Sequence, residues 1–141
     1  MFPAAVLVVV VLAAITVDSA IAFLGQREVA NAVAAAANDA AGEGVGNSAF
    51  YQGDRIDLDP GAVQQVAVAQ VTAALDPSRF HNLSVDVAVT PPAVAGCPPQ
   101  VRVQASATVS ALFGAAVPGG GGERRVEASS SGSPHQGNGG C

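Results

Sequence analysis

The chain starts with an almost entirely apolar block, MFPAAVLVVVVLAAITVDSAIAFL, in which Asp18 is the only charged residue. A helix that is apolar on every face must be surrounded by apolar material, and about twenty helical residues span roughly 30 Å, the hydrocarbon thickness of a bilayer. Pro3 suits the first turn of such a helix. The pattern predicts a transmembrane helix over residues 1–25. Asp18 lies toward its C-terminal end, where water or a neighbouring helix can reach the carboxylate, and we expect it to be an interface or assembly residue.

From Gln26 the pattern becomes amphipathic and rich in alanine, which predicts a stalk helix over residues 26–45 that the glycines at 42, 44 and 46 end. A stripe of small apolar residues lies opposite the polar positions, and such a stripe permits close approach of another helix from the same chain or from a neighbouring subunit. The alternative is an ordinary stalk that packs on its own sheet. The candidate packing and assembly residues are Asp18, Arg27, Val29, Ala30, Val33, Ala34 and Ala37.

The rest of the chain shows one further helical pattern and three alternating ones. Asp59 is a plausible N-cap for a helix from Pro60 to about Leu75. Alternating apolar residues then predict three strands, around residues 83–89, 101–113 and 126–128. The predicted fold class is α+β: a long N-terminal transmembrane and stalk helix, a second helix, and a small three-stranded antiparallel sheet. Residues 46–128 form the small α+β domain, and residues 129–141 form a disordered Gly/Ser-rich tail.

Composition narrows the possible functions. The chain of 141 residues has a net charge of -5 and no Lys, so it has no basic surface for nucleic acid. His81 and His135 lack the spacing of catalytic or zinc motifs, and the abundant small side chains support close packing more readily than a deep ligand pocket. We therefore expect no enzymatic activity, no catalytic, cofactor-binding or metal site, and no small-molecule substrate.

The two cysteines, Cys97 and Cys141, are too few for a disulfide framework. They are compatible with a single bridge that tethers the tail if this part of the chain lies in an oxidising compartment. Two unpaired thiols are the alternative, because separation in sequence does not show whether the Cα atoms come within about 7 Å of each other.

The run LVVVVLAAITVDSAIAFLGQREVANAVAAAANDAAGE resembles the N-terminal segment of TadE/TadG-like proteins, the minor pilin-like components of tight-adherence (Tad, Flp-type) pilus systems. The shared features are an apolar helix, an Asp near its outer end (Asp18), a basic residue (Arg27) and an Asn38-Asp39 step in an Ala-rich stretch. The segments IDLDPGAVQQVAVAQVTAAL and VRVQASATVSALFG, followed by RRVEASSSG, also match the later order of that group. The resemblance implies a single-pass protein of the cell membrane with an extracytoplasmic C-terminal domain.

The first functional hypothesis is accordingly a structural or assembly subunit of a Tad/Flp-type pilus or related secretion system. Its expected partners are the lipid bilayer, other pilin or pseudopilin subunits and the pilus assembly platform. The alternative is a secreted α+β binding module, because Ala20-Ile21-Ala22 fits the small-x-small pattern of a signal-peptide cleavage site.

Overall fold

The computed structural model describes residues 2–45, 57–92, 94, 97–114 and 122–134. Two helices and three strands follow one another in the order α1 (Phe2–Glu43), α3 (Pro60–Ala74), β1 (Phe80–Thr90), β2 (Gln100–Ser110) and β3 (Glu123–Gly132). The strands form one antiparallel sheet in the order β1-β2-β3. The predicted α+β fold class is confirmed.

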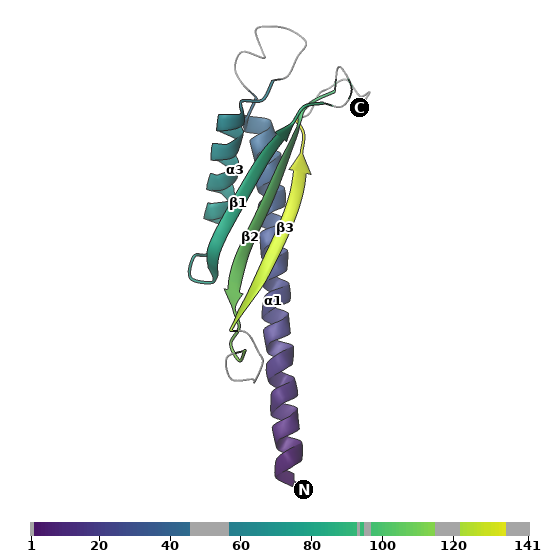
Figure 1. The fold of residues 1–141 in the computed structure, drawn as a ribbon, viewed down its shortest axis with the longest axis vertical. Coiled ribbons are helices and arrows are strands. Elements are labelled where there is room, and N and C mark those ends of the chain that lie inside the picture. The colour runs from purple at the N-terminus through teal and green to yellow at the C-terminus, as the bar shows by residue number, and fades with distance from the viewer. Residues whose placement is uncertain (1, 46–56, 93, 95–96, 115–121, 135–141) are drawn as a thin grey trace.

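Helix α1 is a single helix of 42 residues, with no break at the boundary expected between the transmembrane and stalk segments. Its N-terminal part projects beyond the sheet, and its C-terminal part lies against the sheet beside α3 (Figure 1). The large apolar side chains from Val6 to Val17 are exposed, whereas Val29 and Val33 are completely buried. Within the described residues, α1 is the one helix long and apolar enough to cross a membrane, although a signal sequence fits the same length and composition.

Below, "the head" means α3, the three strands and the part of α1 from Gly25 to Glu43. Helix α3 begins as predicted: Asp59 is its N-cap and accepts a hydrogen bond from the Gly61 N–H at 2.8 Å, and Pro60 occupies the first turn. The helix ends at Ala74. Its buried face consists of Val63, Ala67 and Val71.

The core lies between the two helices and one face of the sheet. Strand β2 is central, so its inward row is buried throughout, whereas the corresponding row of the edge strand β1 is only half-buried. Helix α1 packs over β2 and β3, and α3 lies mainly beside β1 (Figure 1). Among the described residues, the buried apolar side chains other than Leu58, Leu75 and Phe80 are all Val and Ala, which lets the layers approach closely.

Two strand boundaries differ from the sequence prediction. Strand β2 ends at Ser110 rather than continuing to Phe113, because the chain leaves the sheet at this point and turns toward α1. Strand β3 continues to Gly132, so residues 129–132, expected in a disordered tail, instead pair with residues 101–104 of β2. The period-2 pattern in β3 is weak because its inward row has Ser130 and Gly132 beyond Val126 and Ala128, so hydrophobicity alone did not reveal the end of the strand.

The turn between α3 and β1 is organised by Asp76. Its carboxylate accepts a hydrogen bond from the Ser78 N–H at 2.8 Å, and its backbone carbonyl accepts from the N–H groups of Arg79 and Phe80 at 3.0 Å. The hydrogen bonds from Ser78, helped by the nearby positive charge of Arg79, lower the pKa of Asp76 below its ordinary value of 3.8.

This lowered pKa predicts an acid-sensitive turn. A carboxyl group whose folded pKa is depressed stabilises the fold fully above its unfolded pKa, and that stabilisation is lost as the pH falls through the folded pKa. We expect an NMR titration of the Asp76 carboxyl carbon to have its midpoint below 3.8. The Ser78→Ala variant, which keeps the backbone donor and loses the side-chain donor, should raise that midpoint part of the way. A wild-type midpoint at or above 3.8 would contradict the prediction.

Candidate functional site: the junction between the apolar helix and the head

Asp18 lies where the projecting part of α1 meets the head. Among the described residues it is the one buried charged or polar side chain, with 8% of its surface exposed. Its carboxylate accepts hydrogen bonds from the backbone N–H of Leu112 at 2.9 Å and of Phe113 at 3.1 Å. A buried carboxylate is costly unless it is hydrogen-bonded, and two backbone donors satisfy this one. Asp18 therefore fastens the head to the apolar helix.

The end of β2 supplies these donors. The Ala111 N–H still donates to the Gly122 carbonyl, at 2.9 Å, so backbone pairing between these two segments continues to Ala111. The next two N–H groups are beyond the paired strand and are directed to Asp18. The carboxylate thus takes the place of a neighbouring strand for two backbone groups that would otherwise lack a protein partner.

Gly25 permits the close approach of α1 to the sheet just above Asp18. A Cβ atom at this position would lie 3.0 Å from Cγ2 of Val109 and 3.7 Å from the ring of Phe80. Gly25 is buried, although its neighbours Leu24 and Gln26 are exposed. Gly25 therefore lets the helix backbone lie close to the sheet, one turn after Ile21, which packs against the core.

Gln26 protects the free edge of the sheet. Its side-chain amide donates to the backbone carbonyl of Glu127 in β3 and accepts from the N–H of the same residue at 3.2 Å. This two-way pairing imitates a neighbouring strand. Because β3 is an edge strand, the pairing covers backbone groups that could otherwise recruit another chain.

Removing the Gln26 amide should loosen this edge. We expect Gln26→Ala to cost about 1–2 kcal/mol, since two hydrogen bonds at a partly exposed site are lost. Hydrogen exchange of the Glu127 amide should accelerate accordingly. Gln26→Glu is the matched variant, because a carboxylate can still accept from the Glu127 N–H but cannot donate to its carbonyl, and it should lie between the wild type and Gln26→Ala. Equal exchange rates in all three proteins would rule out the edge-protecting role.

Within the head, further polar contacts join α1 to α3 and to the turn before β1. Glu28 pairs with Arg79 at 3.0 Å, and the Arg79 guanidinium lies 5.5 Å from the centre of the Phe80 ring. Asp39 accepts a hydrogen bond from Gln70 of α3. These side chains are partly exposed, so each contact contributes little stability and mainly fixes the rotation of the helix.

The structure divides the predicted small-residue stripe. Val29, Val33 and Ala37 are buried against the chain's own sheet and second helix, whereas Ala34 is half-buried and Ala30 is exposed. Arg27 is exposed as well. Additional alanines outside the predicted stripe complete the buried face: Ala32, Ala36, Ala40 and Ala41. In the head, most of this helix face is therefore used within the chain, against the sheet and α3.

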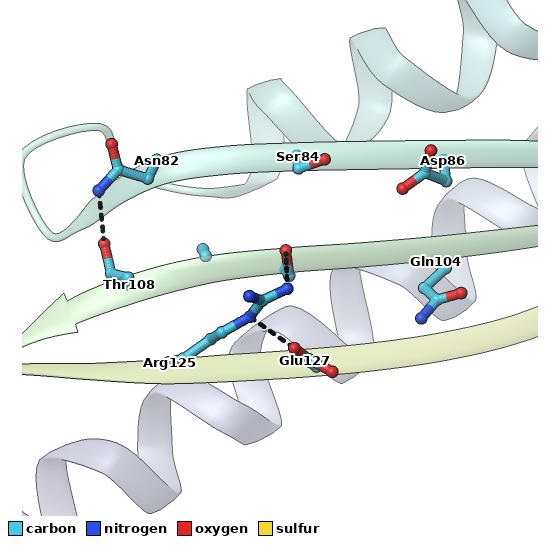
Figure 2. Close-up of a pocket in the computed structure, with 9 residues that line it drawn as sticks. Asn82, Ser84, Asp86, Gln104, Thr108, Arg125 and Glu127 are labelled. Atoms are coloured by element: carbon cyan, nitrogen blue, oxygen red, sulfur yellow. Dashed lines mark hydrogen bonds and ion pairs between the residues drawn. The ribbon is translucent and has the colours of Figure 1, made fainter.

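The outward face of the sheet carries an open polar groove of about 310 Å³. Figure 2 shows its polar side chains, which come from all three strands: Asn82, Ser84, Asp86, Gln104, Ser106, Thr108, Arg125 and Glu127. Arg125 pairs with Glu127 and donates to Ser106 at 3.4 Å. His81, which precedes Asn82 and its positive-φ bulge, does not line the groove. The groove therefore presents exposed hydroxyl, amide and charged groups.

Metal and cysteine chemistry add no further site within the described part of the chain. No group of three or more His, Cys, Asp or Glu side chains in that part is arranged to hold a metal ion. Cys97 is half-buried, and no free cysteine occurs among the described residues. Its predicted partner Cys141, like His135, lies outside them.

The sequence marked Asp18 by its isolation but could not show its partners. Leu112 and Phe113 were predicted as the end of a strand, and nothing in their local pattern signals a contact with a residue more than 90 positions earlier. Comparison of the chain with protein-family models, with curated proteins and with solved structures finds no match.

Proposed function

We propose that the chain is a membrane-anchored, pilin-like structural or assembly subunit of a Tad/Flp-type pilus or a related secretion system. The observation that carries the proposal is the continuity of α1: one uninterrupted helix exposes apolar side chains along its first part and forms the core of the head with its second part. Apolar surface exposed on every side of a helix needs lipid or other apolar helices around it.

The Asp18 contacts favour a retained helix over a cleaved signal peptide. Cleavage after Ala22 would remove Asp18 and leave the N–H groups of Leu112 and Phe113 without their acceptor. It would also leave Phe23 and Leu24 at the new terminus, both of them exposed and apolar. Because these hydrogen bonds join the head to Asp18, we expect the mature protein to keep the helix segment that contains Asp18.

The same contacts suggest how such a subunit would assemble. Because the Asp18 carboxylate is already bonded within the chain, its role in assembly would be to set the direction of the head relative to the helix. The exposed Val, Leu and Ala side chains of residues 3–17 would then supply the side-by-side contacts between helices in the membrane. The membrane location, the single-pass topology and the extracytoplasmic head belong to this proposal.

Intact-mass measurement and N-terminal sequencing of the protein from native membranes test the anchor. We expect a chain that retains Asp18 and remains in the membrane after an alkaline wash. A soluble product beginning at Phe23 would overturn the proposal and support the secreted module. Neighbouring genes test the pilus assignment separately: a secretion ATPase, polytopic platform proteins and a small Flp pilin are expected beside this one, and their absence would leave an anchored protein without the pilus role.

A further inference from the structure

Two large apolar side chains are exposed at the end of the head nearest the apolar helix. Leu112 is 70% exposed and Phe113 is 43% exposed, immediately after β2. Their backbone N–H groups are bonded to Asp18, so both residues are held at the level of that residue on α1. Exposure of two adjacent large apolar side chains to water is unfavourable, and such a site is typical of a contact with lipid or another protein.

The depth of this level follows from helix geometry. The apolar block of α1 continues past Asp18 to Leu24. At 1.5 Å per residue, Asp18 then lies about 9 Å below the end of that block, within the part of α1 that spans the bilayer in the proposed anchor. The exposed side chains of Phe23 and Leu24 extend the apolar helix surface past Asp18 toward the head, and the next charged residue of α1 is Arg27.

We propose that Leu112 and Phe113 insert into the membrane leaflet nearest the head, as a second lipid contact beside α1. This inference rests on the proposed membrane anchor. The two hydrogen bonds to Asp18 favour insertion, because they satisfy two backbone N–H groups that would be costly to place in the hydrocarbon without partners. They also explain a carboxylate at this depth: the acid serves as the acceptor that lets a non-helical segment lie in lipid.

Charge around this end of the head indicates that lipid contact is apolar rather than electrostatic. Val109, which would lie 3.0 Å from a Cβ atom at Gly25, pairs with Arg124 in the sheet, so charged side chains of β3 lie within about two helix turns of Asp18. Among the described residues, four basic and four acidic side chains lie there: Arg27, Arg79, Arg124, Arg125, Glu28, Asp76, Glu123 and Glu127. These eight charges cancel, and Asp18 adds one negative charge, so this end has no excess of positive charge to attract anionic lipid; we expect zwitterionic lipid to suffice and added salt to have little effect.

Tryptophan reporters test the insertion directly, because the chain has no Trp of its own. Three single-Trp variants of the full chain are placed in vesicles of phosphatidylcholine with and without brominated acyl chains, which quench nearby Trp. Val9→Trp reports on the anchor, Phe113→Trp on the proposed contact, and Val94→Trp on an exposed site beyond the Thr90–Gln100 end of the sheet. We expect blue-shifted, strongly quenched emission from Val9→Trp and Phe113→Trp, and red-shifted, unquenched emission from Val94→Trp.

The outcomes separate the two proposals. Quenching of Val9→Trp without quenching of Phe113→Trp would overturn the insertion while leaving the anchor intact. No quenching of Val9→Trp would overturn the anchor itself. Emission from Phe113→Trp that is blue-shifted but unquenched would mean that another protein surface, such as a second copy of the chain, covers this site, and would also overturn the insertion. Leu112→Trp repeats the measurement at the more exposed neighbour, which guards against a local effect of replacing Phe113.

Discussion

Gly132→Ala is expected to destabilise the head by about 3 kcal/mol, at the upper end of the usual cost of overpacking a core. A Cβ atom at Gly132 would lie 2.4 Å from the carbonyl oxygen and 2.8 Å from the carbonyl carbon of Ala37 in α1. Both neighbours are backbone atoms of a helix interior, so no change of side-chain rotamer can relieve the overlap. Either β3 or α1 must move, which separates the sheet from the helix that covers it.

Hydrogen exchange of the full chain in detergent micelles measures this effect. For core amides of β3 that exchange through unfolding of the head, a loss of about 3 kcal/mol corresponds to roughly hundredfold faster exchange. Gly42→Ala is the matched control: a Cβ atom there would meet nothing within 4 Å, and alanine is preferred over glycine in a helix. Exchange that is equally unchanged in both variants would show that β3 does not pack on α1 as described.

Asp18→Ala is expected to release the end of β2 from α1. Hydrogen bonds to a charged group contribute about 1.5–3 kcal/mol each, and the two N–H groups of Leu112 and Phe113 share one acceptor, so their contributions do not add in full and we expect a local loss of about 3 kcal/mol. The amides of these two residues should exchange roughly a hundredfold faster. Protection near Gly132, at the opposite end of the sheet, should change little.

Two neighbouring variants sharpen this prediction. Asp18→Asn keeps one acceptor oxygen and should show an intermediate effect. Ser19→Ala is the control on the next residue, since its hydroxyl donates only to the Ile15 carbonyl within α1. If the head must be held in a fixed direction for assembly, subunit crosslinking and pilus number should fall in Asp18→Ala and remain unchanged in Ser19→Ala. If the Asp18→Ala variant assembled normally, the hydrogen bonds of Asp18 would not be needed for assembly.

The local elements were predictable because each has a local cause. An apolar run of this length favours helix and lipid, Asp59 followed by Pro60 starts α3, and strict alternation from Val101 to Val109 marks the central strand. Even here, the fold decided the boundaries. Strand β2 stops at Ser110 although the alternation continues to Phe113, because hydrogen bonds to Asp18 replace strand pairing beyond that point.

The sequence indicates only in part which face of α1 points toward the core. Alanine occupies most positions of residues 30–41, so hydrophobicity barely distinguishes one face of the helix from another. Ala30 was grouped with the packing stripe and is exposed, while Ala36 and Ala40 were left out and are fully buried. Polar side chains that bond to distant elements, such as Gln26 and Asp39, fix the rotation that alanine leaves open.

The sequence by itself determined that this protein has a lipid-compatible leading helix and an α+β part with a three-stranded sheet, because helix and strand periodicity and turn residues act over a few neighbouring positions. Only the tertiary structure decided that Asp18 holds Leu112 and Phe113, that Gln26 covers the edge of β3, and that Gly132 meets the backbone of Ala37. These contacts join residues about 100 positions apart. They arise from the way α1 lies across the sheet, and no local pattern records that arrangement.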